Sequence, residues 1–274
     1  MAGNTVFSDT TQRQSSSLFD SIVDNSELEA LGMSSTRKQQ ERDLGSRISE
    51  WLNREEKASL YMSTKKISVQ KRRTMFVVSF GTWDLWKLAE QDIEVAQSSA
   101  ERIVDKLFIH LNNLAIKWST SDTKVILSLP VDMTFLPAFK VRQGVNQKDA
   151  ILLLEHWHER VRGYAEQWQH GSLFLLDANS FVIDQVRRRQ LWVGGLINNE
   201  EFGKDGVAWE NVDEPCVNVT QLPPKQSHCS NPEKFLFWDS LHLGPAAQKS
   251  LATEVFHAVN GSWLAEQSPL AGQQ

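Results

Sequence analysis

Two residues near the C-terminus have types and a spacing suited to acid–base chemistry. Asp239 directly follows an apolar, aromatic run at residues 235–238, and His242 comes three positions later. A carboxylate and an imidazole on a turn between an apolar segment and a helix can face the same pocket. The carboxylate then holds the imidazole in one tautomer, and the imidazole can take a proton from a nucleophile on another segment. The alternative is structural, with Asp239 capping a turn and His242 on the surface.

Apolar runs elsewhere predict the strands that must position such a pair. Residues 74–80, 124–130 and 172–177 are short apolar runs, which are typical of buried strands. Stretches with helical spacing separate them, at residues 93–118 and 147–170. Strands that alternate with helices of this length predict βαβ units and a parallel sheet.

The length of 274 residues suits one large α/β domain, and we expect a single domain over residues 1–274. Within it, residues 1–70 form the least regular segment, and residues 194–233 predict a long loop excursion. A loop of that length in a compact domain is usually functional or a lid. Further expected elements are a strand end at 5–7, helical spacing at 17–31, helices at 45–61, 181–190 and 246–259, and a basic, solvated connector at 65–73.

Composition and charge exclude some classes of function. The net charge of −5 and the pI near 5.8 provide no basic field for nucleic acid or an anionic membrane. No apolar run approaches the ~20 residues of a membrane span. The seven histidines are scattered without the spacing of a zinc site, so we predict neither a metal nor a cofactor. The oligomeric state stays open.

The surroundings of Asp239 and His242 resemble a known block. Residues 229–242 have the sequence CSNPEKFLFWDSLH. This closely resembles the last conserved block of the GDSL, or SGNH, hydrolases, in which Cys-x-x-Pro-x-x-Tyr/Phe-x-Phe-Trp-Asp-x-x-His supplies the Asp and His of a Ser-His-Asp triad. The resemblance, nearest to fungal GDSL-like acylhydrolases, implies ester hydrolysis and a flavodoxin-like, three-layer α/β/α sandwich with a mostly parallel central sheet. It also implies that His242 acts as the base and that Asp239 orients it.

The family's first block, Phe-Gly-Asp-Ser, carries the nucleophile after the first strand. The matching residues here are Phe7-Ser8-Asp9-Thr10, which place Thr10 in the nucleophile slot and Ser8 in the glycine slot. A gapped alignment makes Ser8 the hydroxyl instead, so both residues remain candidates. The departure matters because the methyl group of Thr10 crowds a tight turn and the loss of glycine removes backbone freedom.

Two further blocks imply the donors of an oxyanion hole. Gly45, which precedes an amphipathic helix, matches a glycine whose backbone N–H is such a donor, although it also suits an ordinary turn before a helix. Gly81-Thr82-Trp83-Asp84 matches Gly-x-Asn-Asp but has Trp83 in the asparagine position. An indole donates one hydrogen bond from a different place, and loss of one oxyanion donor costs ~10²–10³ in rate.

These segments lead to one functional hypothesis. Ligands bind beyond the carboxyl ends of the strands in an open parallel sheet, and we expect residues 8–10, 81–84 and 239–242 to converge there. The predicted function is an esterase for a small-molecule, acyl or carbohydrate ester, with Trp83 and Trp86 available to stack on a sugar or to pack in the core. The alternative is a catalytically altered SGNH-like binding module, or a non-hydrolytic cyclase or isomerase.

The cysteines leave the cellular compartment open. Cys216 and Cys229 flank a proline-containing loop and suit one disulfide, and Asn218 and Asn260 begin glycosylation sequons. These features are compatible with a secreted origin. Two reduced thiols in a cytosolic protein are the alternative.

Overall fold

The computed structural model describes residues 5–7, 22–33, 43–118, 122–197, 209–219 and 226–266, with backbone alone at 5–7, 218–219, 226–228 and 262–266. Backbone contacts divide the chain into two compact units. Unit 1 comprises residues 1–133 and 144–177, and unit 2 comprises residues 134–143 and 178–274. The single domain over residues 1–274 stays a prediction.

Unit 1 is built on a parallel sheet with the strand order β1-β2-β3-β4. Its strands are β1 (Thr5–Phe7), β2 (Met75–Ser79), β3 (Thr123–Ser128) and β4 (Gly171–Leu176). The register places Val77 beside Ile126 and Ile126 beside Phe174. The mixed α/β class, the parallel sheet and the strands predicted from the apolar runs are therefore confirmed.

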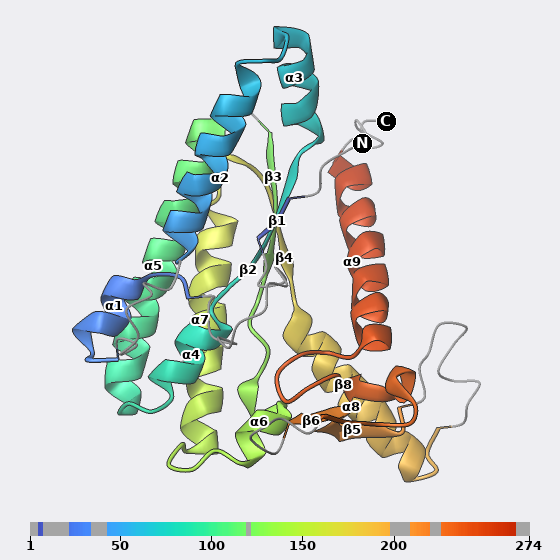
Figure 1. The fold of residues 1–274 in the computed structure, drawn as a ribbon. Helices are drawn as coiled ribbons and strands as arrows, with labels where there is room; N and C mark the ends of the chain where they lie inside the picture. The colour runs from blue at the N-terminus through green and yellow to red at the C-terminus, as the bar shows by residue number, and fades with distance from the viewer. Residues whose placement is uncertain are drawn as a thin grey trace, which may run out of the picture. The chain divides into compact units, whose positions relative to one another are not determined.

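The helices of unit 1 lie between these strands in sequence. They are α1 (Asn25–Ala30), α2 (Leu44–Ser59), α3 (Thr64–Arg73), α4 (Thr82–Leu88), α5 (Ile93–Trp118) and α7 (Gln147–Glu166). Helix α5 packs on both α2 and α7, and Figure 1 shows all three on one side of the sheet. Right-handed crossovers between strands in sequential order place their helices on the same face, as seen here.

An aromatic cluster joins the sheet to these helices. Phe76 of β2 is fully buried, and its ring meets Trp51 of α2 edge-on at 5.0 Å between centroids. Trp118, at the end of α5, completes the cluster at 4.8 Å from Trp51 and 5.9 Å from Phe76. Each such aromatic pair adds ~0.5–1.5 kcal/mol of stability beyond the hydrophobic contribution of its buried area.

Residues 64–73 form helix α3, so the prediction of a solvated connector at 65–73 is wrong. Ser63 caps the helix, because its hydroxyl accepts a hydrogen bond from the backbone N–H of Lys66. The basic residues of the last turn, Lys71, Arg72 and Arg73, lie where the helix dipole favours positive charge. The cap at Ser63 and the basic residues in the last turn stabilise a helix that has few apolar side chains to bury.

Unit 2 contains short strands and two longer helices. Its elements are α6 (Pro137–Lys140), α8 (Ala178–Val193), β5 (Asn211–Pro215), β6 (Val217–Val219), β7 (Gln226–His228), β8 (Phe235–Phe237) and α9 (Pro245–Glu266). Single 3₁₀ turns occur at Met133–Phe135 and Pro232–Lys234. In its described part, the excursion predicted at 194–233 thus contains the strands β5, β6 and β7.

The apolar run at 235–238 forms strand β8, but outside the sheet of unit 1. It pairs in parallel with β5, and β6 pairs antiparallel with β7. The expected convergence of residues 8–10, 81–84 and 239–242 implied that this run ends at the carboxyl edge of the same sheet as β2, and the pairing of β8 with β5 contradicts that placement. An apolar run identifies a strand, whereas its partner depends on residues far away in the sequence.

The structure joins Cys216 and Cys229 in a disulfide with 4.8 Å between their Cα atoms. The backbone N–H of Cys216 donates to the carbonyl of Phe237 at 3.0 Å. That of Val217 donates to the carbonyl of Trp238 at 2.7 Å. The disulfide-linked segment therefore lies against the end of β8, immediately before the predicted acid.

Candidate functional site

Asp239 and His242 contact each other directly. Nδ1 of the His242 ring lies 2.9 Å from both carboxylate oxygens of Asp239. Oδ1 also accepts the backbone N–H groups of Leu241 and His242, each at 2.8 Å. One carboxylate thus caps the turn and holds the imidazole, so the structural and chemical roles proposed for Asp239 are compatible.

Neighbouring backbone groups fix the turn that carries this pair. The N–H of Trp238 donates to the carbonyl of His242 at 2.8 Å. The N–H of Ala138, in α6, donates to the carbonyl of Ser240 at 3.0 Å. Gly244 follows, and a Cβ at this position would come within 2.4 Å of the first carbonyl oxygen of β8. The turn is therefore held from both ends and from α6.

The electrostatics of the pair determine which ring nitrogen is basic. Burial raises the pKa of the Asp239 carboxyl, but hydrogen bonds from the His242 ring and the Leu241 backbone outweigh it, so the pKa is below its ordinary value. An ionised carboxylate only accepts hydrogen bonds, so Nδ1 of His242 carries the proton and Nε2 of the neutral ring is basic. The His242 side chain is 45% exposed, so the imidazole is accessible to solvent.

In unit 1, Gly81 caps α4 two residues after the end of β2. Its φ of +105° is in the region that favours glycine. A Cβ would also come within 2.6 Å of Trp157 Cζ2 and 3.0 Å of Pro130 Cγ. Trp83, which aligns with the asparagine of the resembled Gly-x-Asn-Asp block, is 7% exposed and packs edge-on near Trp86 at 6.0 Å between centroids. The indole is thus an interior group of the described structure.

Asp84 follows and is completely buried. Both of its carboxylate oxygens lie 3.1 Å from the backbone nitrogen of Val23, which donates to them. Burial raises the pKa of Asp84 to about 7, although the hydrogen bond from Val23 acts in the opposite direction. The contact joins the first turn of α4 to the segment that leads into α1, 61 residues earlier in the chain.

Gly45 lies in the first turn of α2, against the ring of His110. A Cβ at Gly45 would come within 2.5 Å of His110 Cε1, so the glycine makes room for the imidazole. Burial lowers the pKa of His110, and its Nε2 lies 3.8 Å from Oδ2 of Asp24. Sequence reasoning identified the glycine but not its neighbour, because His110 is 65 positions away.

The predicted nucleophiles Ser8 and Thr10 lie outside the described residues. Strand β1 ends at Phe7, which pairs in parallel with Val78, so the carboxyl ends of β1 and β2 lie at the same edge of the sheet. Gly81 follows β2 from that edge. Convergence of these positions with the Asp239–His242 pair of unit 2 stays a prediction.

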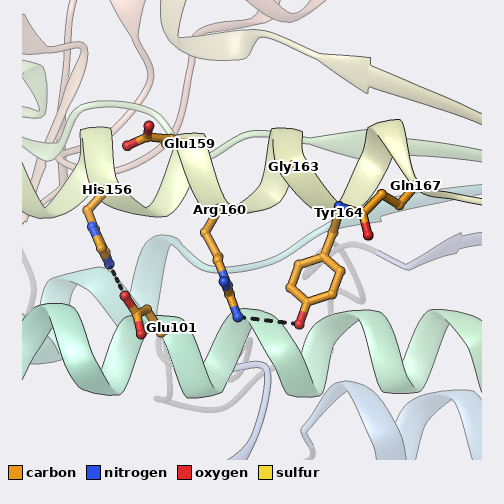
Figure 2. A pocket seen from close by; sticks show the side chains of 7 residues that line it. All are labelled: Glu101, His156, Glu159, Arg160, Gly163, Tyr164 and Gln167. Atoms are coloured by element: carbon orange, nitrogen blue, oxygen red, sulfur yellow. Dashed lines mark hydrogen bonds and ion pairs between the residues drawn. The ribbon is translucent and has the colours of Figure 1, made fainter.

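A second acid–imidazole pair lies in a groove of about 430 Å³ on α5 and α7 (Figure 2). Nε2 of His156 is 3.0 Å from Oε1 of Glu101, and Arg160 lies beside Tyr164. Asp105 accepts hydrogen bonds from Arg160 at 2.9 Å and from Tyr164 at 2.7 Å. These side chains join the two helices, and the described residues that line the groove include no serine, threonine or cysteine. Sequence reasoning gave these residues no role in catalysis, and the structure offers no reason to change that.

Scans against models of known protein families and against curated proteins match none. Among the residues that the structure describes, no group of three or more His, Cys, Asp and Glu side chains could hold a metal ion. No helix in the described part of the chain combines the length and apolar character needed to cross a membrane.

Proposed function

We propose that this protein is an SGNH-type hydrolase that cleaves an acyl or carbohydrate ester, in the three-layer α/β/α fold of that family. The observation that carries the proposal is the contact between Asp239 and the Nδ1 atom of His242, 2.9 Å from each carboxylate oxygen. The resemblance of residues 229–242 to the family's last block gives that contact its catalytic interpretation.

In the proposed reaction, Nε2 of His242 takes the proton from the hydroxyl of Ser8 or Thr10 as the oxygen attacks the ester carbonyl carbon. The resulting imidazolium is stabilised by the Asp239 carboxylate. The imidazolium then gives the proton to the departing alkoxide, which leaves an acyl-enzyme. Water activated by His242 hydrolyses this ester and restores the hydroxyl.

The oxyanion donors differ from those of the family. Burial of Trp83 supports a site without the usual side-chain amide, in which backbone N–H groups near Gly45 and Gly81 stabilise the developing negative charge. Because one donor is missing, we expect turnover ~10²–10³ below that of a complete oxyanion hole.

The tryptophan at position 83, where the resembled family has asparagine, also favours a second candidate function. An SGNH-like protein that has lost the oxyanion amide can keep its ligand site and act as a binding module, or as a non-hydrolytic cyclase or isomerase. Ser8 in the family's glycine slot agrees with this alternative. Stoichiometric binding of an ester without release of its alcohol would distinguish it from the hydrolase.

Hydrolysis of short p-nitrophenyl esters tests the first proposal. We expect His242→Ala and Asp239→Asn to lower kcat by ~10³–10⁴, because the first removes the base and the second gives the imidazole the wrong tautomer. His156→Ala is the matched control, since it disrupts the Glu101–His156 pair, whose contact distance is similar.

Circular dichroism confirms that each variant is folded. A folded wild type without turnover, or one whose activity survives both substitutions at Asp239 and His242, would refute the hydrolase.

A further inference from the structure

The segment from the end of α2 through α3 concentrates positive charge in a chain that is negative overall. From Lys57 to Arg73 the sequence contains six basic residues and no acidic one, against a net charge of −5 for the whole chain. We call residues 57–73 the basic hairpin. Its basic residues are Lys57, Lys65, Lys66, Lys71, Arg72 and Arg73. All except Lys71 are exposed, and Lys71 lies over the ring of Trp118 at 5.3 Å.

The tip of the basic hairpin carries two large apolar side chains in water. Leu60 is 77% exposed and Tyr61 is 90% exposed. The turn is ordered by its own backbone, with the N–H of Tyr61 donating to Ala58 at 3.2 Å and that of Met62 donating to Ser59 at 3.0 Å. Figure 1 shows this turn at the end of α2, where α3 begins. A fixed turn that presents adjacent apolar side chains between lysines has the composition of an interfacial anchor.

Two acidic residues precede the hairpin, and one of them is engaged by a side chain of α3. Glu55 and Glu56 precede Lys57 and line a groove of about 430 Å³ bounded by α2, α3 and α5. The carboxylate of Glu55 accepts a hydrogen bond from the Gln70 side chain at 2.7 Å within this groove. Glu55 is therefore engaged with α3 and does not neutralise the exposed lysines of the tip.

We propose that the basic hairpin docks on the surface of an anionic phospholipid bilayer. Leu60 and Tyr61 enter the boundary between headgroups and acyl chains, where leucine and aromatic side chains partition. Lys57, Lys65 and Lys66 lie at the level of the anionic headgroups. A nucleic acid would use the charges but would leave the adjacent apolar pair without a role, so the bilayer accounts for more of the observations.

The inference goes beyond the proposed esterase, because docking requires neither Asp239 nor His242. The net charge of the whole chain argued against binding to an anionic membrane. The local positive charge of the hairpin changes that expectation. In salt solution, interactions between charges are screened beyond about 10 Å. The charge of the hairpin itself, rather than the net charge of the chain, therefore determines its attraction to an anionic bilayer. Each basic residue near an anionic membrane raises the affinity ~5-fold.

Cosedimentation with vesicles tests the proposal. The full chain is mixed with vesicles of phosphatidylcholine alone, or of phosphatidylcholine with phosphatidylserine, at low and at high salt. We expect binding to the anionic vesicles that weakens as salt rises, and little binding to phosphatidylcholine. Lys65→Glu/Lys66→Glu should lower the affinity at least ~25-fold, and Leu60→Ser/Tyr61→Ser about 10-fold.

Matched variants separate docking from general effects of charge and hydrophobicity. Lys148→Glu/Lys249→Glu changes the net charge equally at exposed lysines of α7 and α9. Val141→Ser/Leu196→Ser removes apolar side chains that are 83% and 73% exposed. Both controls should keep the wild-type affinity.

Absence of binding to anionic vesicles, or an equal loss in the controls, would overturn the proposal. Tighter binding to duplex DNA than to the vesicles, insensitive to Leu60→Ser/Tyr61→Ser, would overturn it in favour of a nucleic acid.

Discussion

Replacing Asp84 by asparagine tests the electrostatics of the interior. The carboxyl is fully buried and accepts the Val23 N–H with both oxygens. Asp84→Asn keeps the shape of the side chain and an oxygen that can accept this hydrogen bond. The amide cannot ionise, so the variant carries no charge at this position at any pH. The variant therefore separates the cost of a buried charge from the contribution of the contact.

The magnitude follows from the pKa of Asp84, which burial raises from 3.8 to about 7. Because the folded pKa is above the unfolded value, the folded state binds more protons between these two pH values. The stabilisation is fully present below about pH 3.8 and is lost as the pH rises through about 7. Between pH 5 and pH 8 this amounts to roughly 2–3 kcal/mol of unfolding free energy.

Urea denaturation at pH 5, 6, 7 and 8 measures this loss. We expect the difference in unfolding free energy between Asp84→Asn and wild type to grow with pH by that amount, in favour of the variant at pH 8. Asp122→Asn, which removes an exposed carboxylate, should parallel the wild type. Parallel curves for Asp84→Asn and wild type would refute the assignment of a raised pKa.

Two further predictions concern the backbone and the disulfide. Gly81→Ala should cost roughly 2–4 kcal/mol in thermal unfolding, because a Cβ meets Trp157 at 2.6 Å and φ is positive. Gly144→Ala has positive φ but no neighbour within 4 Å, so it should cost about 1 kcal/mol, and equal costs would show that the contact is unimportant. Cys216→Ser/Cys229→Ser opens a link between residues 13 apart and should lower the unfolding free energy by about 3 kcal/mol, whereas an unchanged urea midpoint would contradict this.

The parts of the fold that sequence predicted are those fixed by local pattern. The runs at 74–80, 124–130 and 172–177 are apolar and bounded by polar or proline residues, and each forms a strand of the parallel sheet. Spacing alone also predicted most of α5 and α7. A continuous apolar run or a long amphipathic stripe identifies the type of element without reference to its partners, so the local pattern is sufficient to predict it.

Other elements depend on features that a hydrophobic pattern does not contain. Helix α3 is too polar to show an apolar stripe and is specified by its cap at Ser63 and by basic residues in its last turn. The strands within 194–233 are three to five residues long and are stabilised by pairing and by the Cys216–Cys229 disulfide. The strands with which they pair are identified only from the three-dimensional structure.

The candidate site shows the same division. The contact of Asp239 with His242 is local, and the three-residue spacing together with the resemblance of residues 229–242 to the family block pointed to it. The bond between Asp84 and Val23 spans 61 positions, and the packing of Gly45 on His110 spans 65. A single sequence gives no signal for such long-range pairs.

The proposed hydrolase requires the Asp239–His242 pair to activate the hydroxyl of Ser8 or Thr10. Labelling with a serine-directed fluorophosphonate, followed by peptide mass mapping, tests it most directly. We predict a covalent adduct on Ser8 or Thr10 in the wild type and in His156→Ala, and a labelling rate reduced by ~10³ or more in His242→Ala. An N-terminal peptide without an adduct, or equal labelling of wild type and His242→Ala, would contradict the proposed role of the Asp239–His242 pair.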